Sequence, residues 1–169
     1  MTRSDIVKYI LADLNEDAIV VASTGFISRE VFKQADRPLN FYMCGSMGNA
    51  LSIGIGLALK LKQPVLVING DGSALMSLGS MLTAEDLRKK NRLNNLVHYI
   101  IDNNCHESTG GQRTVSHLIN FAHLFKNTIV YKVSKDSTVP PRITLSPSQI
   151  TERFKNALLR QQEQQKISQ

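Results

Sequence analysis

Two strongly apolar segments, each followed at once by a polar turn, constrain the fold more than any other feature of the sequence. Residues 64–69 and 96–101 consist mainly of Val, Leu and Ile, without the alternation of a half-exposed strand. Such runs are typical of parallel strands buried on both faces. Helical patterns lie between the strands, as in sheets covered by helices on both sides. The sequence therefore predicts an α/β fold with a doubly wound, mostly parallel sheet of about five or six strands.

Capping residues, glycines and prolines predict the remaining elements. Further strands are expected at residues 17–22, 40–44 and 128–133. Helices are expected from an N-cap at Ser4 to about Leu14, over residues 28–34 and 49–62, from near Ser73 or Ala74, over 116–124, and from Ser146 or Ser148 to about Arg160. Residues 1–160 are thus expected to form one domain, and the Gln-rich residues 161–169 a frayed tail.

Composition and length argue against several classes of protein. The chain has 169 residues, of which 42% are hydrophobic, and this is enough for one domain with a real core. Cys44 and Cys105 match neither a disulfide framework nor a zinc site, so reduced thiols are expected. No apolar run approaches the roughly 18 residues of a membrane span, and the N-terminus does not resemble a signal peptide. A cytoplasmic protein without membrane contact is expected.

The charge allows two interpretations. A formal charge of +6 and a pI of about 9.5 are compatible with nucleic-acid binding. However, the Lys and Arg residues are scattered and no aromatic residues are interleaved with them, which favours solvated helix faces. We therefore expect no nucleic-acid partner, and note that a mildly basic surface suits anionic ligands.

The turns that follow the two apolar strands carry the candidate chemistry. In Gly70-Asp71-Gly72-Ser73 the glycines allow the backbone to approach a ligand closely, and the helix that follows offers free N–H groups to phosphate. An aspartate suits Mg²⁺, which takes one or two carboxylates together with phosphate oxygens. An ordinary tight turn is the competing interpretation.

Asn103 strengthens the prediction, because it follows the next strand along the chain. The carboxyl ends of neighbouring parallel strands meet at one edge of a sheet, so Asp71 and Asn103 would lie close enough to share a cation. A main-chain oxygen from the turn beyond would be a third ligand. An Asx turn that ends the strand is the competing interpretation for Asn103, and both stay open on the residues alone.

The same motifs resemble a known family. Gly70-Asp71-Gly72, with Asn103 32 residues after Asp71, resembles the fingerprint of thiamine-diphosphate-dependent enzymes, with a slightly longer interval than usual. The wider chain resembles the thiamine-diphosphate-dependent phosphonopyruvate and sulfopyruvate decarboxylases, and the phosphonopyruvate enzymes most. The resemblance covers most of residues 5–133 and 140–159, and its motifs are residues 23–30, 40–48, 70–76, 106–112, 141–147 and 152–154.

The resemblance implies that the chain binds thiamine diphosphate and Mg²⁺. The implied metal ligands are the side chains of Asp71 and Asn103, rather than Asn104, and the carbonyl of Cys105. The Gly45 carbonyl would accept a hydrogen bond from the aminopyrimidine, and Met47 would prop the bent cofactor, although core filling is the alternative for Met47. The full implied cofactor-binding set is Gly45, Ser46, Met47, Gly70, Gly72 and Ser73.

The resemblance also implies residues that face the substrate. His106 is the candidate catalytic residue, either as a proton donor or through hydrogen bonds that hold the loop. Ser108, Thr109 and Gln112 are candidate donors to an anionic substrate. Arg29 is a more distant candidate for that task, with a solvated helix residue as the alternative. The other histidines are expected to be structural, namely His98, His117 and His123.

Enzymes of this family have two related domains, and the chain resembles only the one that binds the diphosphate. No segment resembles the pyrimidine domain, which supplies an activating glutamate. The resemblance therefore implies a split enzyme: a hetero-oligomer with a pyrimidine-domain partner, which converts phosphonopyruvate to phosphonoacetaldehyde and CO₂. A sulfopyruvate decarboxylase beta subunit and a catalytically silent binding or regulatory subunit are the alternatives. Full-length relatives carry an additional helical stretch near residues 124–135, which this chain lacks. Whether the shortened segment impairs activity stays open.

Overall fold

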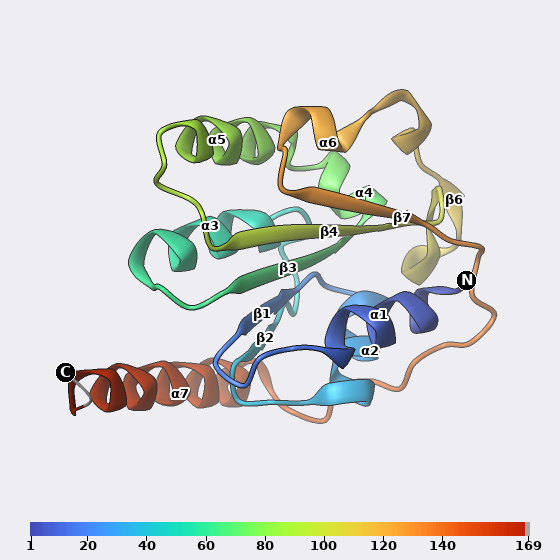
Figure 1. The fold of residues 1–169 in the computed structure, drawn as a ribbon. Coiled ribbons are helices and arrows are strands. Elements are labelled where there is room, and N and C mark those ends of the chain that lie inside the picture. The colour runs from blue at the N-terminus through green and yellow to red at the C-terminus, as the bar shows by residue number, and fades with distance from the viewer. Residues whose placement is uncertain (168–169) are drawn as a thin grey trace.

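A central sheet of five parallel strands organises the molecule (Figure 1). The structure is a computed structural model that describes residues 1–167, with the backbone alone for residues 164–167. The strand order is β2-β1-β3-β4-β7, so the direction in which successive strands are added to the sheet reverses between β1 and β3. Ligands bind at such a switch point in doubly wound sheets. The predicted fold class is confirmed. The strands are β1 (Ile19–Ala22), β2 (Asn40–Tyr42), β3 (Val65–Gly70), β4 (Leu96–Asp102) and β7 (Thr128–Lys132).

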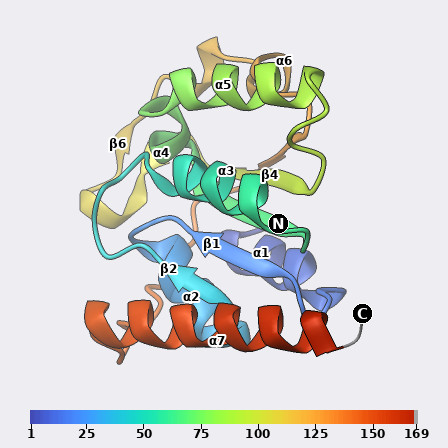
Figure 2. The same ribbon diagram turned by 90° about the vertical axis from the view of Figure 1, so that its left-hand side faces the viewer.

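The helices lie on both faces of the sheet. Figure 1 shows α1 (Arg3–Ala12) and α2 (Phe26–Ala35) on one face, and α3 (Ala50–Lys60), α5 (Leu78–Lys89) and α6 (Phe121–Leu124) on the other. The long helix α7 (Pro147–Ile167) runs along the β2 edge, where the Phe154 ring packs 5.3 Å from that of Phe41 (Figure 2). None of the helices in residues 1–167 is both long and apolar enough to cross a membrane.

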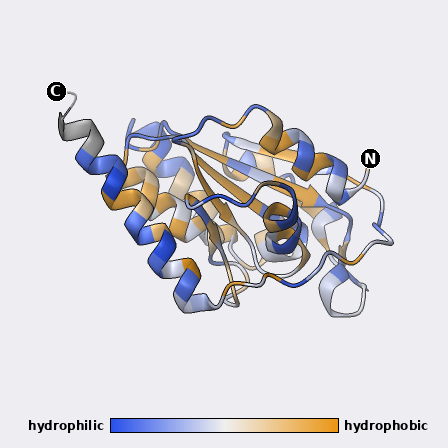
Figure 3. Ribbon diagram, turned by 90° about the horizontal axis from the view of Figure 1, so that it is seen from below, coloured by the Kyte–Doolittle hydropathy of each residue, from blue (hydrophilic) through white to orange (hydrophobic). Residues whose placement is uncertain are grey.

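Strand sequence explains the two cores. Alternate residues of a strand point to opposite faces, and both sets are apolar here. Val65 and Val67 of β3 join the core under α3 and α5, whereas Ile68 joins the core under α1 and α2. Figure 3 shows apolar strands enclosed by helices whose outer faces are hydrophilic.

Two helix starts illustrate how local hydrogen bonds decide the boundaries. Helix α1 is capped by Thr2 and not by Ser4 as expected, because Thr2 and Asp5 form a reciprocal capping box. The Ser4 hydroxyl instead donates to Glu30, at 2.9 Å. At α7 the expected cap is present, since the Ser146 hydroxyl accepts from the backbone N–H of Gln149 at 3.2 Å.

Three other expectations differ from the structure. The helix expected near Ser73 starts earlier, as the short α4 (Asp71–Leu75) before α5. The helix expected over 116–124 is a 3-10 turn (Ser116–Leu118) followed by α6, because Ile119 is extended and the Ser116 hydroxyl hydrogen-bonds elsewhere. The tail expected to fray from residue 161 is helical as far as Ile167, since Gln, Glu and Lys are good helix formers. Residues 168–169 of that tail lie outside the described residues.

Candidate functional site

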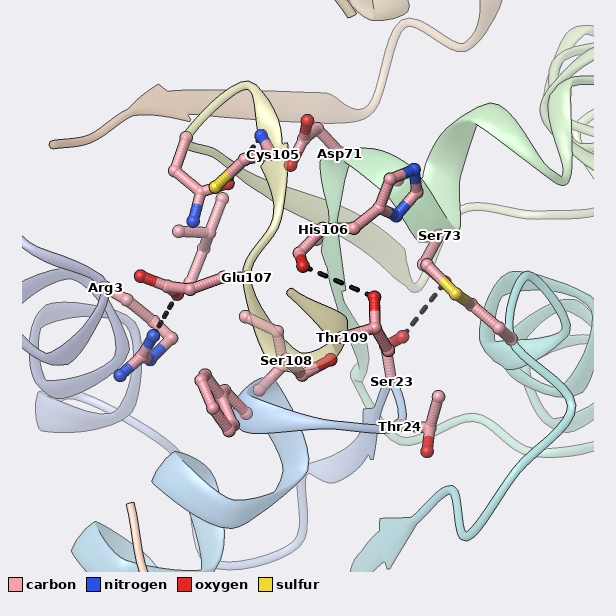
Figure 4. A pocket seen from close by; sticks show the side chains of 17 residues that line it. Arg3, Ser23, Thr24, Asp71, Ser73, Cys105, His106, Glu107, Ser108 and Thr109 are labelled. Carbon is pink, nitrogen blue, oxygen red and sulfur yellow. Dashed lines mark hydrogen bonds and ion pairs between the residues drawn. The ribbon is translucent and has the colours of Figure 1, made fainter. Parts of the chain in front are cut away.

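The turns after β1, β3 and β4 line one pocket at the carboxyl edge of the sheet (Figure 4). This is the edge at which parallel α/β sheets bind ligands. The register brings the strand ends level, because Gly70 of β3 lies opposite Ile101 of β4. The lining residues are Arg3, Ser23, Thr24, Phe26, Ile27, Met47, Gly70, Asp71, Gly72, Ser73, Ile101, Asn103, Cys105, His106, Glu107, Ser108 and Thr109.

The three residues predicted to ligate Mg²⁺ all line this pocket. Asp71 is only 2% exposed, and the Thr114 hydroxyl donates to its Oδ2. Burial raises the pKa of Asp71, and the nearby Asp102 carboxylate adds to the increase, although the Thr114 hydrogen bond opposes it. A cation beside Asp71 would favour its charged form and so offset the cost of burial. The predicted convergence of Asp71, Asn103 and Cys105 is therefore present, and metal ligation itself stays a prediction.

The two asparagines after β4 have different surroundings. The Oδ1 of Asn103 accepts from the N–H of Cys105 at 3.1 Å, so the Asx turn considered for this residue is present. An amide oxygen has two lone pairs, and the turn leaves one for a cation. Asn104 lies outside the pocket lining, and its Oδ1 accepts from the Ser116 hydroxyl at 3.1 Å. The placement supports Asn103 as the candidate ligand.

The donor set fits a magnesium diphosphate. One carboxylate, one amide oxygen and one carbonyl oxygen are hard ligands, and they leave coordination positions for phosphate oxygens. Residues 1–167 contain no cluster of three or more His, Cys, Asp or Glu side chains that would favour a transition metal. Gly72 is also required by close packing, because a Cβ there would lie 2.5 Å from the His106 ring and 3.2 Å from Met47.

A buried hydrogen-bond chain supports the start of α4. The Ser73 hydroxyl accepts from the Ser23 hydroxyl at 2.9 Å and from the backbone N–H of Gly48 at 3.1 Å, and donates to Asn69 at 3.2 Å. Asn69 in turn contacts Nε2 of His98 at 2.9 Å. Burial lowers the pKa of His98 to about 3, so this histidine is neutral and structural, as expected. This series of hydrogen bonds holds the turn at Gly48 beside the predicted diphosphate site.

The predicted cofactor residues divide into two groups. Met47, Gly70, Gly72 and Ser73 line the pocket, and Met47 keeps 38% of its surface exposed. Gly45 and Ser46 are exposed and do not line it. Their predicted roles concern the far end of the cofactor, beyond the diphosphate. Those roles stay predictions.

The segment after β4 contributes most of the predicted substrate-facing residues. A short hairpin, β5 (Cys105–His106) and β6 (Gln112–Arg113), encloses the 3-10 turn Glu107–Thr109. His106, Ser108 and Thr109 line the pocket, whereas Gln112 is exposed outside it. Arg29 also lies outside the lining, and its guanidinium stacks on the Phe26 ring at 5.4 Å.

Several lining residues carry no role in the sequence-based prediction. Ser23, Thr24 and Phe26 follow β1 directly, so the strand-end reasoning applied to β3 and β4 would have found them. Arg3 and Glu107 are different, because they form an ion pair although they lie 104 residues apart in the sequence. Neither residue gives a local signal of this pairing.

Comparison with known proteins identifies the family of the chain. The family described as "Thiamine pyrophosphate enzyme, C-terminal TPP binding domain" matches residues 23–165; thiamine pyrophosphate is thiamine diphosphate. A phosphonopyruvate decarboxylase of Streptomyces viridochromogenes is 46% identical over 119 residues, which are 70% of this chain and 29% of that protein. The sulfopyruvate decarboxylase subunit beta of Methanocaldococcus jannaschii is 42% identical over 156 residues, which are 92% of this chain and 77% of the subunit.

A solved structure shows the same fold at lower identity. The Rhodococcus jostii RHA1 thiamine diphosphate-dependent 4-hydroxybenzoylformate decarboxylase superposes with a TM-score of 0.58 at 20% identity, covering 94% of this chain and 30% of that one. The chain thus spans under a third of the length of this decarboxylase and of the phosphonopyruvate decarboxylase. From the match over residues 23–165, the chain belongs to the family of C-terminal TPP-binding domains of thiamine pyrophosphate enzymes, which confirms the resemblance seen in its motifs.

Proposed function

We propose that the chain is the diphosphate-binding subunit of a thiamine-diphosphate-dependent 2-oxo acid decarboxylase that acts on phosphonopyruvate. The observation that carries the proposal is the convergence of Asp71, Asn103 and Cys105 on one pocket at the carboxyl ends of β3 and β4. The similarity to a phosphonopyruvate decarboxylase supports the substrate.

Each group of pocket residues has a distinct task in this proposal. Asp71 and Asn103 hold Mg²⁺, and the backbone at Gly72 and Ser73 binds the diphosphate. Met47 orients the middle of the cofactor. Thiamine diphosphate, when bound, supplies the electron sink that loss of CO₂ from a 2-oxo acid requires. His106, Ser108 and Thr109 also line the pocket, where they would contact the acid and, at the His106 ring, hold a proton.

A partner subunit follows from the carboxylates of the pocket. Asp71 and Glu107 are the acidic residues among the lining residues. Asp71 is assigned to the metal, and both oxygens of Glu107 are engaged, one by Arg3 and one by the backbone N–H of Asp136 at 2.9 Å. The described part of the pocket therefore offers no free carboxylate to activate the aminopyrimidine. We propose that a pyrimidine-domain subunit brings that glutamate in a hetero-oligomer.

Sulfopyruvate is the second candidate substrate. Its support is the match to two sulfopyruvate decarboxylase beta subunits, which this chain covers to 77% and 98% of their length. Both acids carry an anionic group on the carbon next to the 2-oxo group, so the pocket has little to discriminate them. The ratio of kcat/KM for the two acids decides which is the substrate.

The test is CO₂ release by the purified chain alone and after mixing with a pyrimidine-domain subunit. We expect no turnover by the chain alone and Mg²⁺-dependent turnover by the mixture, with phosphonoacetaldehyde or sulfoacetaldehyde as the second product. Full turnover by the single chain would contradict the split-enzyme proposal. Cofactor binding without turnover of either acid in the mixture would instead indicate a catalytically silent subunit.

A further inference from the structure

Arg3, near the start of α1, is buried in the wall of the pocket and surrounded by carboxylates. Its side chain is 2% exposed, and its guanidinium pairs with Glu107 (Figure 4). The same guanidinium donates to the carbonyl of Thr138 at 2.8 Å, and lies 3.6 Å from Asp136 and 3.9 Å from Glu30. One arginine therefore joins α1, α2, the segment after β4 and the segment after β7.

Stability alone does not explain this cluster. Taking three carboxylates and one guanidinium out of water is costly, and buried ion pairs often add nothing over apolar contacts of similar volume. The Nε of Arg3 and the Oδ2 of Asp136 are buried without a hydrogen-bond partner, which adds to the cost. What such a cluster does supply is a defined geometry, because charged hydrogen bonds are directional.

The Arg3 cluster defines the geometry of residues 105–113, the segment after β4 that lines the pocket. Three consecutive side chains of this segment contact three different elements. The His106 ring packs on Gly72 at the start of α4, and Ser108 packs on Gly25 before α2, where a Cβ would lie 2.8 Å from Oγ. Between them, the Glu107 side chain points in the opposite direction, toward Arg3, with which it forms an ion pair. The Glu107 anchor thus sets where its two neighbours lie in the pocket.

We infer that Arg3 is a positioning residue that acts through Glu107 on residues 105–113. It holds this segment so that His106, Ser108 and Thr109 face the pocket. The inference rests on the proposed function for its meaning in catalysis, and on the structure alone for the positioning. Arg3 is not itself an anion-binding residue, because Nη1 is occupied by Glu107 and Nη2 by Thr138.

Hydrogen exchange of the full chain tests the positioning without any substrate. Glu107→Gln keeps the shape of the side chain and leaves Arg3 with Asp136 and Glu30, so it is the milder variant, and Arg3→Lys is the second. The probes are the amides of Gly111 and Thr114, which donate to His106 at 3.0 Å and to Asn104 at 2.9 Å. In both variants we expect these amides to exchange about tenfold faster, with β4 unchanged.

Arg153→Lys is the matched control, because it weakens the bidentate ion pair between Arg153 of α7 and Asp36 at the end of α2, and neither residue lines the pocket. This control should leave residues 105–113 at the wild-type rate. Wild-type exchange of Gly111 and Thr114 in both pocket variants would overturn the inference. Equal acceleration across β4 would also overturn it, because Arg3 would then stabilise the fold as a whole.

Kinetics of the reconstituted enzyme provide a second readout. We expect Glu107→Gln to raise KM for the acid about tenfold, with kcat reduced less. A lower KM in Glu107→Gln would contradict positioning, because it would mean that a released Arg3 binds the anionic substrate directly. If the wild-type complex turns over neither acid, the proposed function fails, and the hydrogen-exchange result still decides the role of Arg3.

Discussion

A buried aspartate lies at the end of each of β3 and β4, and the two carboxylates have very different hydrogen-bond and charge partners. Asp102, at the end of β4, is 0% exposed and fully satisfied: Oδ1 accepts from the Ser116 hydroxyl at 2.9 Å and the Asn104 N–H at 3.0 Å, and Oδ2 pairs with Lys132. Asp71, just after β3, is 2% exposed and has one side-chain donor, Thr114. No ion pair with a described basic residue reaches Asp71.

The difference separates a structural carboxylate from one that we propose to bind a ligand. A buried carboxylate without a cation is costly unless something else neutralises it. The cation for Asp102 is Lys132 of the same chain, whereas the cation that we propose for Asp71 is a bound Mg²⁺. Asp71 is also the one of the two that lines the pocket.

The largest effect is expected at the end of β3. Asp71→Ala removes the one carboxylate proposed for the metal, so Mg²⁺ with thiamine diphosphate should no longer raise the unfolding temperature. At ligand concentrations about 1,000-fold above Kd, the stabilisation lost would be about 4 kcal/mol. Thermal unfolding with and without both ligands measures it. An undiminished shift in the variant would show that the metal site is misassigned.

The corresponding change at the end of β4 should act without any ligand. Asp102→Ala leaves the Asn104 N–H without its acceptor and leaves the Ser116 hydroxyl with Asn104 Oδ1 alone, so we expect about 2 kcal/mol less free energy of unfolding. Lys132 adds little to this figure because its side chain is 61% exposed and can be hydrated. Urea unfolding without cofactor is the measurement. A variant as stable as the wild type would remove the contrast between the two aspartates.

Acid should lower the free energy of unfolding through His98, which contacts Asn69 of β3. Its folded-state pKa is about 3, against an ordinary value of 6.5, because it is buried. Below pH 6.5 the unfolded chain therefore binds a proton that the folded chain does not, and stability falls as the pH decreases. Between about pH 7.5 and 5.5 the loss attributable to this group is about 1.4 kcal/mol. The His98→Asn variant should lack this component in urea unfolding, and an equal pH slope in both proteins would contradict it.

The smallest effect concerns the single donor to Asp71. Thr114→Val removes the hydroxyl that holds the carboxylate, and we expect Mg²⁺ affinity to weaken by about 1 kcal/mol, or roughly fivefold. Titration calorimetry of Mg²⁺ in the presence of thiamine diphosphate measures this change. Thr114→Ser retains the hydroxyl and should restore most of the affinity. If Ser and Val weaken binding equally, the hydrogen bond does not orient Asp71.

Much of the fold and part of the site could be predicted from the sequence, for a physical reason. Buried parallel strands have a continuous apolar signature, and their ends meet at one edge, so Asp71 and Asn103 were placed together correctly. The contact between Arg3 and Glu107 could not be predicted, because it depends on the path of loops across the whole chain. The position of Gln112 also could not be predicted, because this residue shares a motif with Ser108 but lies outside the pocket.

The most direct test is a crystal structure of the chain with thiamine diphosphate and Mn²⁺ in place of Mg²⁺. The anomalous signal locates the ion independently of any assumption about its ligands. We expect one peak in the pocket, about 2.2 Å from the Asp71 carboxylate, the Asn103 side-chain oxygen and the Cys105 carbonyl. A bound cofactor whose Mn²⁺ lies on Asp102, or contacts neither Asp71 nor Asn103, would contradict the assignment of the site.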